Sequence, residues 1–331
     1  MNKGMNNTGS TVDKPDISVI IVSWNAKHYL VECLGSLSSS GPGESIEVIV
    51  VDNASTDGSP EAVEKDFPEV KIIKNETNRG FAAANNIGIE QSRGRYVCLI
   101  NSDIKVLGNC LERLCDYMDS NSSIGMVGPK ILNPDMTLQC SCRSFPGLWN
   151  NFCTATGLSR IFRDARLFSG EHMLFFKHDV VRRVNVLVGC FLVVRREALN
   201  QVGLLDGRFF IYSEDIDWCR RFWNAGWEVA FFPGSQAIHY RGGSSSNAPV
   251  KFAIEQDRAV LQYWKKYHQI PSQVAILFIM ALKHVLRIGA GVLFLLIRSS
   301  KKTNTLHNIK NHVACLLSLF LPQKIYQSTT E

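Results

Sequence analysis

The sequence YVCLINSD, residues 96–103, places a run of apolar residues directly before a short polar group that ends in Asp103. An apolar run of this length between polar turns is typical of a strand buried on both faces of a sheet. In parallel sheets, ligands bind where the strands end and the loops begin. We therefore expect the Asp103 carboxylate at a ligand-binding edge, where it suits Mg²⁺ or Mn²⁺ held against a diphosphate. The alternative interpretation is that Asp103 is the N-cap of a following helix.

The segments around this stretch alternate in the same way between apolar runs and helical spacing. Strands are predicted at 17–23, 47–52, 70–74 and 96–101, and helices at 27–37, 60–67, 82–91 and 111–118. This alternation predicts an α/β fold with a mostly parallel sheet covered by helices. Further on, strands are predicted at 186–196 and 227–232 and a helix at 213–224. Residues from about 144 to 185 have no clear period, and we interpret them as a variable excursion that shapes an acceptor site.

The composition divides the chain into three parts. Residues 1–16 are polar and contain no apolar core of a secretory signal, so we expect a disordered N-terminus. Residues 17–250 form the predicted catalytic domain. The ten cysteines are scattered without C-x-x-C spacing, which favours reduced thiols in the cytoplasm. Their one closely spaced pair, Cys140 and Cys142, is a weak metal motif.

The tail, residues 251–331, carries most of the positive charge of the chain. It holds 11 Lys and Arg against 3 Asp and Glu, whereas the first 250 residues hold 25 against 27. Its apolar run at 274–297 is interrupted by Lys283, His284 and Arg287 at helical spacing, and a second apolar run follows at 313–321. A spanning helix would bury two charges, so we expect basic, apolar helices lying in the membrane interface, with that stripe facing anionic headgroups. The alternative is a helix pair packed on the protein itself. The tail is the basic part, so the charge does not predict nucleic-acid binding.

Two nucleotide-binding signatures are missing from the sequence. The turn after the first predicted strand reads SWNAK, residues 23–27, instead of G-x-G-x-x-G, and no G-x-x-x-x-G-K-[ST] occurs. This argues against a nicotinamide dehydrogenase and a P-loop enzyme. It also disfavours a nucleotidyltransferase, which typically needs a glycine-rich basic loop at this point.

Several carboxylates and one histidine are candidates for a site. Asp52 ends the second predicted strand. Its carboxylate either binds a nucleobase or ribose or forms hydrogen bonds within the tight turn that follows. Ser213 precedes Glu214, Asp215 and Asp217, an arrangement that suits a serine N-cap with acidic residues in the first helical turn. Such a position lowers a carboxylate pKa and keeps a general base ionised. His239 follows a predicted strand and is a candidate metal ligand, although a lone histidine is more often structural.

Seven blocks in order resemble the family 2 glycosyltransferases with a GT-A fold, especially their bacterial rhamnosyltransferase-like branch. They cover about residues 17–246 and read VSWNAKHYLVECLGSL, VVDNASTDGS, NRGFAAANNIGI, YVCLINSD, GMVGPKILNPD, FFIYSEDIDWCRR and IHYRGGSS. The resemblance is specific for the family and much less so for the sugar. It implies a GT-A fold, to which the tail adds the amphipathic or apolar C-terminal helices predicted from its composition.

The resemblance also implies roles for individual residues. Those expected to bind the nucleotide-sugar are Ser23, Asn25, Asp52, Arg79, Gly80, Asn85, Ser102 and Asp103. Asp103 matches the last acid of the metal-binding D-x-D element, but Asn101 stands where many relatives have Asp. The metal site is therefore one carboxylate short, which increases the expected role of His239. Asp215 resembles the general base and Glu214 an acceptor contact, with Asp217 a secondary candidate.

The implied reaction is a single displacement that inverts the anomeric carbon and uses Mg²⁺ or Mn²⁺. The expected donor is dTDP-rhamnose, with UDP- and GDP-sugars as alternatives, and the expected acceptor is a lipid-linked saccharide at the cytoplasmic face of a membrane. A non-catalytic sugar-nucleotide-binding relative or membrane scaffold is the rival hypothesis. The retained Asp103, Glu214, Asp215 and His239 argue against it.

Overall fold

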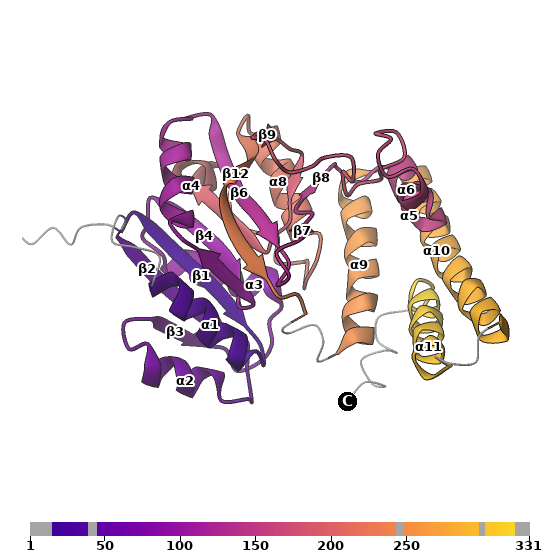
Figure 1. Cartoon of the computed structure of the whole chain (residues 1–331), viewed down its shortest axis with the longest axis horizontal. Coiled ribbons are helices and arrows are strands. Elements are labelled where there is room, and N and C mark those ends of the chain that lie inside the picture. The colour runs from indigo at the N-terminus through magenta and orange to yellow at the C-terminus, as the bar shows by residue number, and fades with distance from the viewer. Residues whose placement is uncertain (1–14, 39–44, 243–247, 298–301, 322–331) are drawn as a thin grey trace, which may run out of the picture.

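The computed structural model describes residues 15–38, 45–242, 248–297 and 302–321. A large mixed sheet with its helices occupies one side of the molecule, and the C-terminal helices lie on the other side (Figure 1). Most of the polar segment 1–16, the glycine loop after Gly242 and the end of the tail from 322 lie outside the described residues, so the predictions for them stay open.

The first half of the chain forms the predicted parallel arrangement. Its strands are β1 (Ile17–Ser23), β2 (Ile46–Asp52), β3 (Lys71–Lys74) and β4 (Tyr96–Asn101), in the spatial order β3-β2-β1-β4. The pairs β1–β2, β2–β3 and β1–β4 are all parallel. The connecting helices are α1 (Lys27–Ser38), α2 (Ser59–Asp66) and α3 (Phe81–Gln91). The strand ends with Ser23, Asp52 and Asn101 therefore meet at one edge.

The second half extends the sheet in the order β11-β6-β12-β5 beyond β4. These elements are β5 (Ile104–Leu107), α4 (Cys110–Asp119), β6 (Ile124–Leu132), β11 (Phe191–Arg195) and β12 (Glu228–His239). β6 and β12 pair parallel to each other, whereas β11 lies antiparallel between β4 and β6, and β5 pairs antiparallel with β12. The sheet is therefore mixed, with most strands parallel.

Two predicted strands have the wrong bounds. The strand predicted at 186–196 is divided into β10 (Val186–Leu187) and β11, because residues 188–190 leave the sheet edge to line the site. The strand predicted at 227–232 continues through a register shift after Phe232 and ends at His239. His239 is consequently held inside a sheet instead of in a loop.

The remaining elements are short or lie in the excursion. They are β7 (Leu138–Gln139), β8 (Cys142–Arg143), β9 (Arg182–Arg183), α5 (Leu148–Thr156), α6 (Leu158–Ile161), α7 (Arg196–Val202) and α8 (Glu214–Asn224). β8 pairs with β10, and β9 pairs with β12.

Buried apolar residues cover both faces of the sheet. One cluster includes the inner faces of α1, α2 and α4, and the other includes those of α3, α7 and α8. The second cluster continues into the tail through Tyr263, Trp264, Ile276 and Met280. The continuous apolar strand sequences follow from this burial on both sides.

The tail forms α9 (Pro249–Tyr267), α10 (Ile270–Ile297) and α11 (Lys302–Ser318). By length and composition, α10 is the one helix among the described residues that is long and apolar enough to cross a membrane. The predicted basic stripe does not face outward, however. Lys283 and His284 both contact the buried Asp257 of α9, at 2.8 Å each, and Arg287 is half-buried. A buried carboxylate requires such partners, so these residues turn inward and leave an apolar face outside.

Candidate active site

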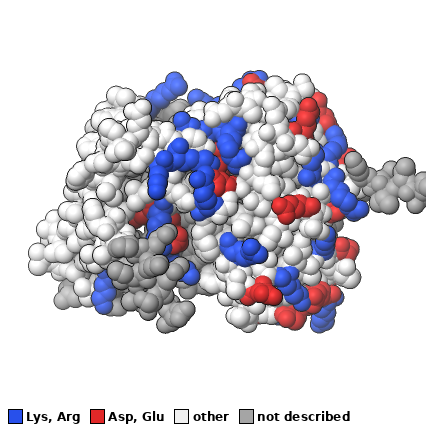
Figure 2. Space-filling model, turned by 180° about the vertical axis from the view of Figure 1, so that it is seen from behind, with Lys and Arg blue, Asp and Glu red and all other residues white. Residues whose placement is uncertain are grey.

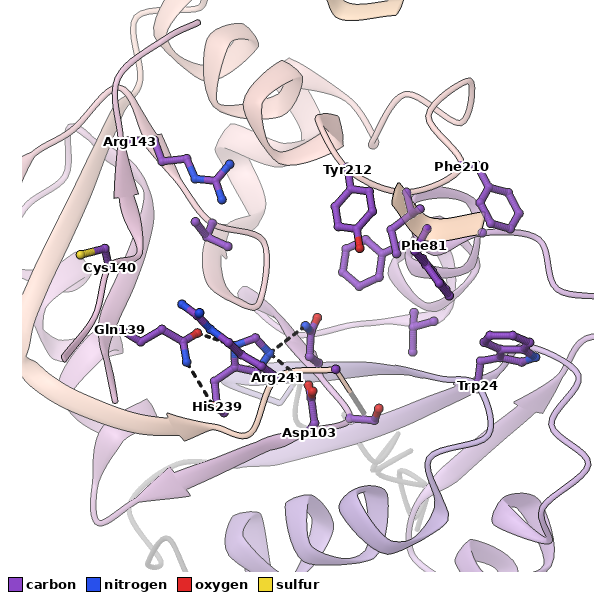
Figure 3. Close-up of a pocket in the computed structure, with 18 of the residues that line it drawn as sticks. Trp24, Phe81, Asp103, Gln139, Cys140, Arg143, Phe210, Tyr212, His239 and Arg241 are labelled. Carbon is purple, nitrogen blue, oxygen red and sulfur yellow. Dashed lines mark hydrogen bonds and ion pairs between the residues drawn. The ribbon is translucent and has the colours of Figure 1, made fainter. Parts of the chain in front are cut away.

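A cavity of about 730 Å³ lies at the edge where β1, β4 and β12 end. Of the residues predicted from the sequence, Gly80, Ser102, Asp103 and His239 line it. Figure 3 shows aromatic side chains, among them Trp24, Phe81, Phe210 and Tyr212, on one side, and Asp103 with His239 toward the other. We call this cavity the donor chamber. It combines a flat apolar wall with a polar floor.

The polar floor is organised around Asp103 and His239. Asp103 Oδ1 lies 3.2 Å from His239 Nε2, and both side chains are largely buried. The antiparallel pairing of β5 with β12 sets His239 opposite Ile104, next to Asp103 in the chain. Asp103 is therefore followed by a strand, and the N-cap interpretation is wrong for it.

Gln139, which the sequence did not single out, orients His239. Its side-chain NH₂ donates to Asn133 Oδ1 at 2.9 Å and to the His239 carbonyl at 3.1 Å. Gln139 Oε1 must then accept from His239 Nδ1, 2.7 Å away, which directs Nε2 toward Asp103 (Figure 3). Burial lowers the pKa of His239, but the neighbouring Cys190 and Asp103 outweigh burial and raise that pKa to about 10.

These groups suit a divalent cation. Asp103 would contribute a carboxylate. His239 would contribute Nε2 once the cation displaces the proton that its raised pKa keeps there, and its Nδ1 hydrogen bond to Gln139 is of the kind usual for metal-bound histidine. Asn101 stands where a second carboxylate was expected, and its Nδ2 lies 3.4 Å from His239 Nε2. Its Oδ1 is buried without a hydrogen-bond partner among the described residues, and rotation of the amide would present this oxygen as an ordinary ligand of a hard cation.

The predicted nucleotide-binding residues on β1 and β2 lie beside the donor chamber and do not line it. Ser23 and Asp52 are paired neighbours at the ends of their strands, and Ser23 Oγ and Asp52 Oδ1 are buried without a partner among the described residues. Asp52 Oδ2 accepts from the Ser55 amide at 2.9 Å. Asn25 Oδ1 accepts from the Thr56 amide at 2.7 Å and so joins the two loops.

Asn53 is the chamber residue at this end that sequence reasoning missed. Its Nδ2 donates to the Gly80 carbonyl at 3.2 Å, and its Oδ1 accepts from the Arg79 amide at 3.2 Å. The Arg79 side chain itself is exposed, and Asn85 is buried one turn into α3, where it donates to the Phe81 carbonyl. Neither Arg79 nor Asn85 lines the chamber. Asn53 thus fixes the loop that leads into α3.

Residue 80 is a glycine for two reasons, its backbone conformation and the close approach of Phe210. Its φ is +83°, and a Cβ there would lie 2.4 Å from the Phe210 carbonyl oxygen. The next amide, that of Phe81, donates to the same oxygen at 2.6 Å. The start of α3 is therefore in direct backbone contact with the loop before α8, which brings the two walls of the site together.

A second, smaller cavity of about 240 Å³ adjoins the donor chamber, and we call it the acceptor chamber. The residues that line both are Phe81, Asn101, Arg143, Val188, Ile211, Tyr212 and His239. Glu214 and Asp215 line the acceptor chamber alone. Asp103 of the predicted metal set thus lies in one chamber, the predicted base Asp215 lies in the other, and His239 belongs to the wall that they share.

Asp215 is held by backbone amides. Its Oδ2 accepts from Gly189 at 2.9 Å and its Oδ1 from Ile216 at 2.8 Å. These two amides fix the direction of the carboxylate. For the neighbouring Glu214, burial and the charge of Asp215 raise the pKa well above the usual range. The expected lowering at the helix N-terminus is therefore wrong for Glu214.

The backbone before α8 is strained. Tyr212 and Ser213 both have positive φ, 70° and 64°. Ser213 occupies the N-cap position as predicted, with the acidic residues in the first turn, but its side chain makes no capping hydrogen bond. Asp215 Oδ1 accepts from the Ile216 amide there. Strained residues persist where surrounding contacts fix them, often at functional sites. Here they turn Tyr212 into the shared wall.

Asp217 is not a site residue, which corrects its place as a secondary candidate. It is fully buried outside both chambers and contacts Arg221 at 2.9 Å, Tyr267 at 2.7 Å and Lys266 at 2.5 Å. The last two residues belong to α9, so Asp217 ties α8 to the tail.

The excursion lines the acceptor chamber through Pro146, Asn151 and Glu171. The opposite wall comes from α9, with Tyr263 and Trp264. The excursion also packs α5 along α10 (Figure 1). It therefore lies between the site and the tail, a location that its irregular sequence did not reveal.

The fold and the paired chambers define a glycosyltransferase of the GT-A type. The chain resembles the mannosyltransferase PcManGT from Pyrobaculum calidifontis in complex with GDP-Man and Mn²⁺, with a TM-score of 0.54 and 15% identity over 93% of this chain and 86% of that one. It also resembles GalNAc-T7 with UDP, GalNAc and Mn²⁺, with a TM-score of 0.53 and 17% identity, covering 75% of this chain and about half (48%) of that one.

Residues 18–203 match glycosyl transferase family 2, and the chain belongs to that family. A similar curated protein is the N-acetylglucosaminyl-diphospho-decaprenol L-rhamnosyltransferase of Mycobacterium tuberculosis. It is 29% identical over 252 residues, which cover 70% of this chain and 78% of that protein.

Proposed function

We propose that this glycosyltransferase moves a sugar from a nucleotide-sugar to a hydroxyl of a lipid-linked saccharide, with inversion at the anomeric carbon. The observation that carries the proposal is that Asp215 in the acceptor chamber and Asp103 in the donor chamber adjoin one shared wall, which includes His239. L-rhamnose from dTDP-rhamnose is the proposed donor sugar, supported by the mycobacterial relative. That relative's name also supports a lipid-diphosphate acceptor, and we propose that the product belongs to a cell-surface polysaccharide.

In the proposed reaction, the donor's nucleotide occupies the donor chamber near Trp24 and Asn53, beside Ser23, Asn25 and Asp52. Asp103, His239 and Asn101 would hold Mg²⁺ or Mn²⁺, which supplies positive charge to the departing diphosphate when bound. Both solved relatives were determined with Mn²⁺, which supports a divalent ion without separating the two metals. Gln139 keeps His239 Nε2 directed at this position.

Asp215 acts as the proposed general base. An acceptor hydroxyl in the acceptor chamber donates its proton to the Asp215 carboxylate as its oxygen attacks the anomeric carbon from the side opposite the diphosphate. A single attack of this kind inverts the configuration. Glu214, whose raised pKa favours the neutral acid, contacts the acceptor instead of removing its proton.

The proposed place of action is the cytoplasmic face of a membrane, reached through the tail. The outward face of α10 is apolar, with Phe278 at 67% and Leu293 at 57% exposure. A helix of this kind is suited to lie in the interface with its apolar face in the lipid. This differs from the predicted contact through Lys283 and His284, which turn inward.

The test is a thermal-shift titration with dTDP, UDP, GDP and NAD, each with and without Mn²⁺. A ligand at a hundred times its Kd stabilises the folded state by about 2.7 kcal/mol, which is readily measured. We expect a metal-dependent shift with dTDP, and a loss of the metal-dependent part in Asp103→Asn. A shift with UDP or GDP instead would correct the donor. No shift with any diphosphate would favour the non-catalytic relative.

A further inference from the structure

The end of α6 and the chain after it expose an unusual amount of apolar surface. Every residue from 160 to 167, RIFRDARL, is exposed, with Ile161 at 70%, Phe162 at 48% and Leu167 at 64%. Soluble surfaces seldom gather large apolar side chains so closely unless something covers them. Trp149 donates from Nε1 to the Leu167 carbonyl at 2.9 Å and is itself 45% exposed, so this stretch is fixed on α5.

This exposed stretch adjoins the outward face of α10. α5 packs along α10, and Figure 1 shows α5 and α6 beside the first turns of that helix. Most of the exposed large apolar residues of α10 lie within one half of the helix surface, with Phe294 outside it: Ile270, Val274, Phe278, Leu282, Val285, Leu286, Val292, Leu293, Leu296 and Ile297. In Figure 2, the tail side of the molecule shows few charged side chains, in contrast to the sheet side.

The charges on the exposed stretch point to the kind of partner. Arg160, Arg163 and Arg166 are all exposed and alternate with the apolar residues, and Asp164 is the one acid among them. Large apolar side chains next to several arginines are suited to a bilayer interface, where the apolar groups enter the acyl region and the arginines meet anionic headgroups.

We propose that residues 149–167 form a second membrane-contacting element, which docks on an anionic lipid bilayer together with the outward face of α10. This inference rests on the proposed membrane location of the enzyme and extends it to the excursion. It also gives the excursion a purpose, because Asn151 within this element and Pro146 beside it line the acceptor chamber. A lipid-linked acceptor would then reach Asp215 directly from the bilayer surface.

The test is flotation of the full chain with phosphatidylcholine vesicles, with and without phosphatidylglycerol. We expect the wild type to float best with phosphatidylglycerol, and the double variant Ile161→Ser, Phe162→Ser to lose at least tenfold of its vesicle partitioning. Arg160→Gln with Arg163→Gln and Arg166→Gln should remove only the gain due to phosphatidylglycerol. The matched control is Val180→Ser with Val181→Ser, two exposed apolar residues next to β9.

Two results would overturn the inference. One is unchanged flotation of the Ile161, Phe162 variant, which would leave α10 as the contact. The other is a change in its sedimentation mass with flotation intact, which would make the stretch an interface between protein chains. The nucleotide-dependent thermal shift of each variant reports folding separately, and its absence in the wild type would refute the proposed function without affecting the flotation result.

Discussion

Both carboxylate oxygens of Asp215 accept backbone hydrogen bonds, one from Gly189 and one from Ile216. An oxygen has a second lone pair, so the carboxylate can still receive a proton from an acceptor hydroxyl in the acceptor chamber. The two amides fix the direction of the carboxylate, and the carboxylate itself is the proposed proton acceptor.

Asp215→Asn should remove the base at nearly constant side-chain volume, although its NH₂ cannot accept and one of the two backbone hydrogen bonds is lost. General-base catalysis contributes about 10²- to 10⁴-fold, so we expect kcat to fall by about that factor. Donor binding should be unchanged, because Asp215 does not line the donor chamber. Steady-state transfer and a nucleotide thermal shift measure the two quantities. A variant that keeps most of its transfer rate would remove Asp215 from the mechanism.

Glu214 gives a prediction about pH. Burial raises its pKa above the usual 4.5, so the folded state keeps a proton that the unfolded chain loses. Wild-type stability from this group is therefore present below about pH 4.5 and falls as the pH rises toward the raised pKa. Glu214→Gln cannot ionise and does not lose this stability. Its free energy of unfolding in urea, relative to that of the wild type, should therefore rise from pH 5 to pH 8. Exposed Glu90→Gln is the control, and an equal difference at both pH values would contradict the prediction.

At the scale of elements, the contact between α8 and α9 depends on a buried ion-pair cluster. Asp217 is the one carboxylate that meets Arg221, Lys266 and Tyr267 together. α8 carries Asp215, and α9 lines the acceptor chamber. The cluster therefore sets two walls of the site relative to each other.

Asp217→Asn should cost about 1–3 kcal/mol in free energy of unfolding, because it removes the charge that pairs with Arg221 and Lys266, while Lys266 keeps its second partner Asp206. Urea unfolding measures this. The exposed pair of Arg93 with Glu47 gives the comparison, since Arg93→Gln should cost no more than about 1 kcal/mol. A similar small loss in Asp217→Asn would show that the cluster does not hold the helices.

The sequence predicts the parallel half of the sheet well, because β1, β2 and β4 are apolar runs buried on both faces. β6 was missed because Gly125, Gly128 and Pro129 disguise its pattern. In the site, Asp103 and His239 could be paired by resemblance, and the structure brings them together. Gln139 and Asn53 could not be found, because their roles arise from contacts with distant parts of the chain.

At the scale of the whole molecule, one side of the tail packs into the hydrophobic core and the other side is exposed. Ile276 and Met280 of α10 are buried in the same cluster as α8. The outward residues of α10 remain exposed and apolar. One helix thus combines packing against the protein with a proposed contact to lipid.

Removal of the chain from Gln273 onward should release the protein from membranes into the soluble fraction. It should also lower the melting temperature, because the buried side of α10 is lost with the outward side. Membrane fractionation and a thermal melt measure the two effects. Unchanged fractionation of the truncated chain would refute the anchor.

Residues 188–190, between β10 and β11, contact both Asn101 and Asp215 and so set the distance between these two residues. The Cys190 carbonyl accepts from the Asn101 amide at 3.0 Å, and the adjacent Gly189 amide donates to Asp215. Asn101 on the proposed leaving-group side and Asp215 on the proposed attacking side are thus both hydrogen-bonded to neighbouring peptide units of the same segment. A shift of one residue in the register between β4 and β11 would move Asn101 and Asp215 relative to each other by about 3.3 Å, which is more than a near-attack geometry tolerates. Insertions at 188–190 should therefore be tolerated far less than insertions in the excursion, although both border the acceptor.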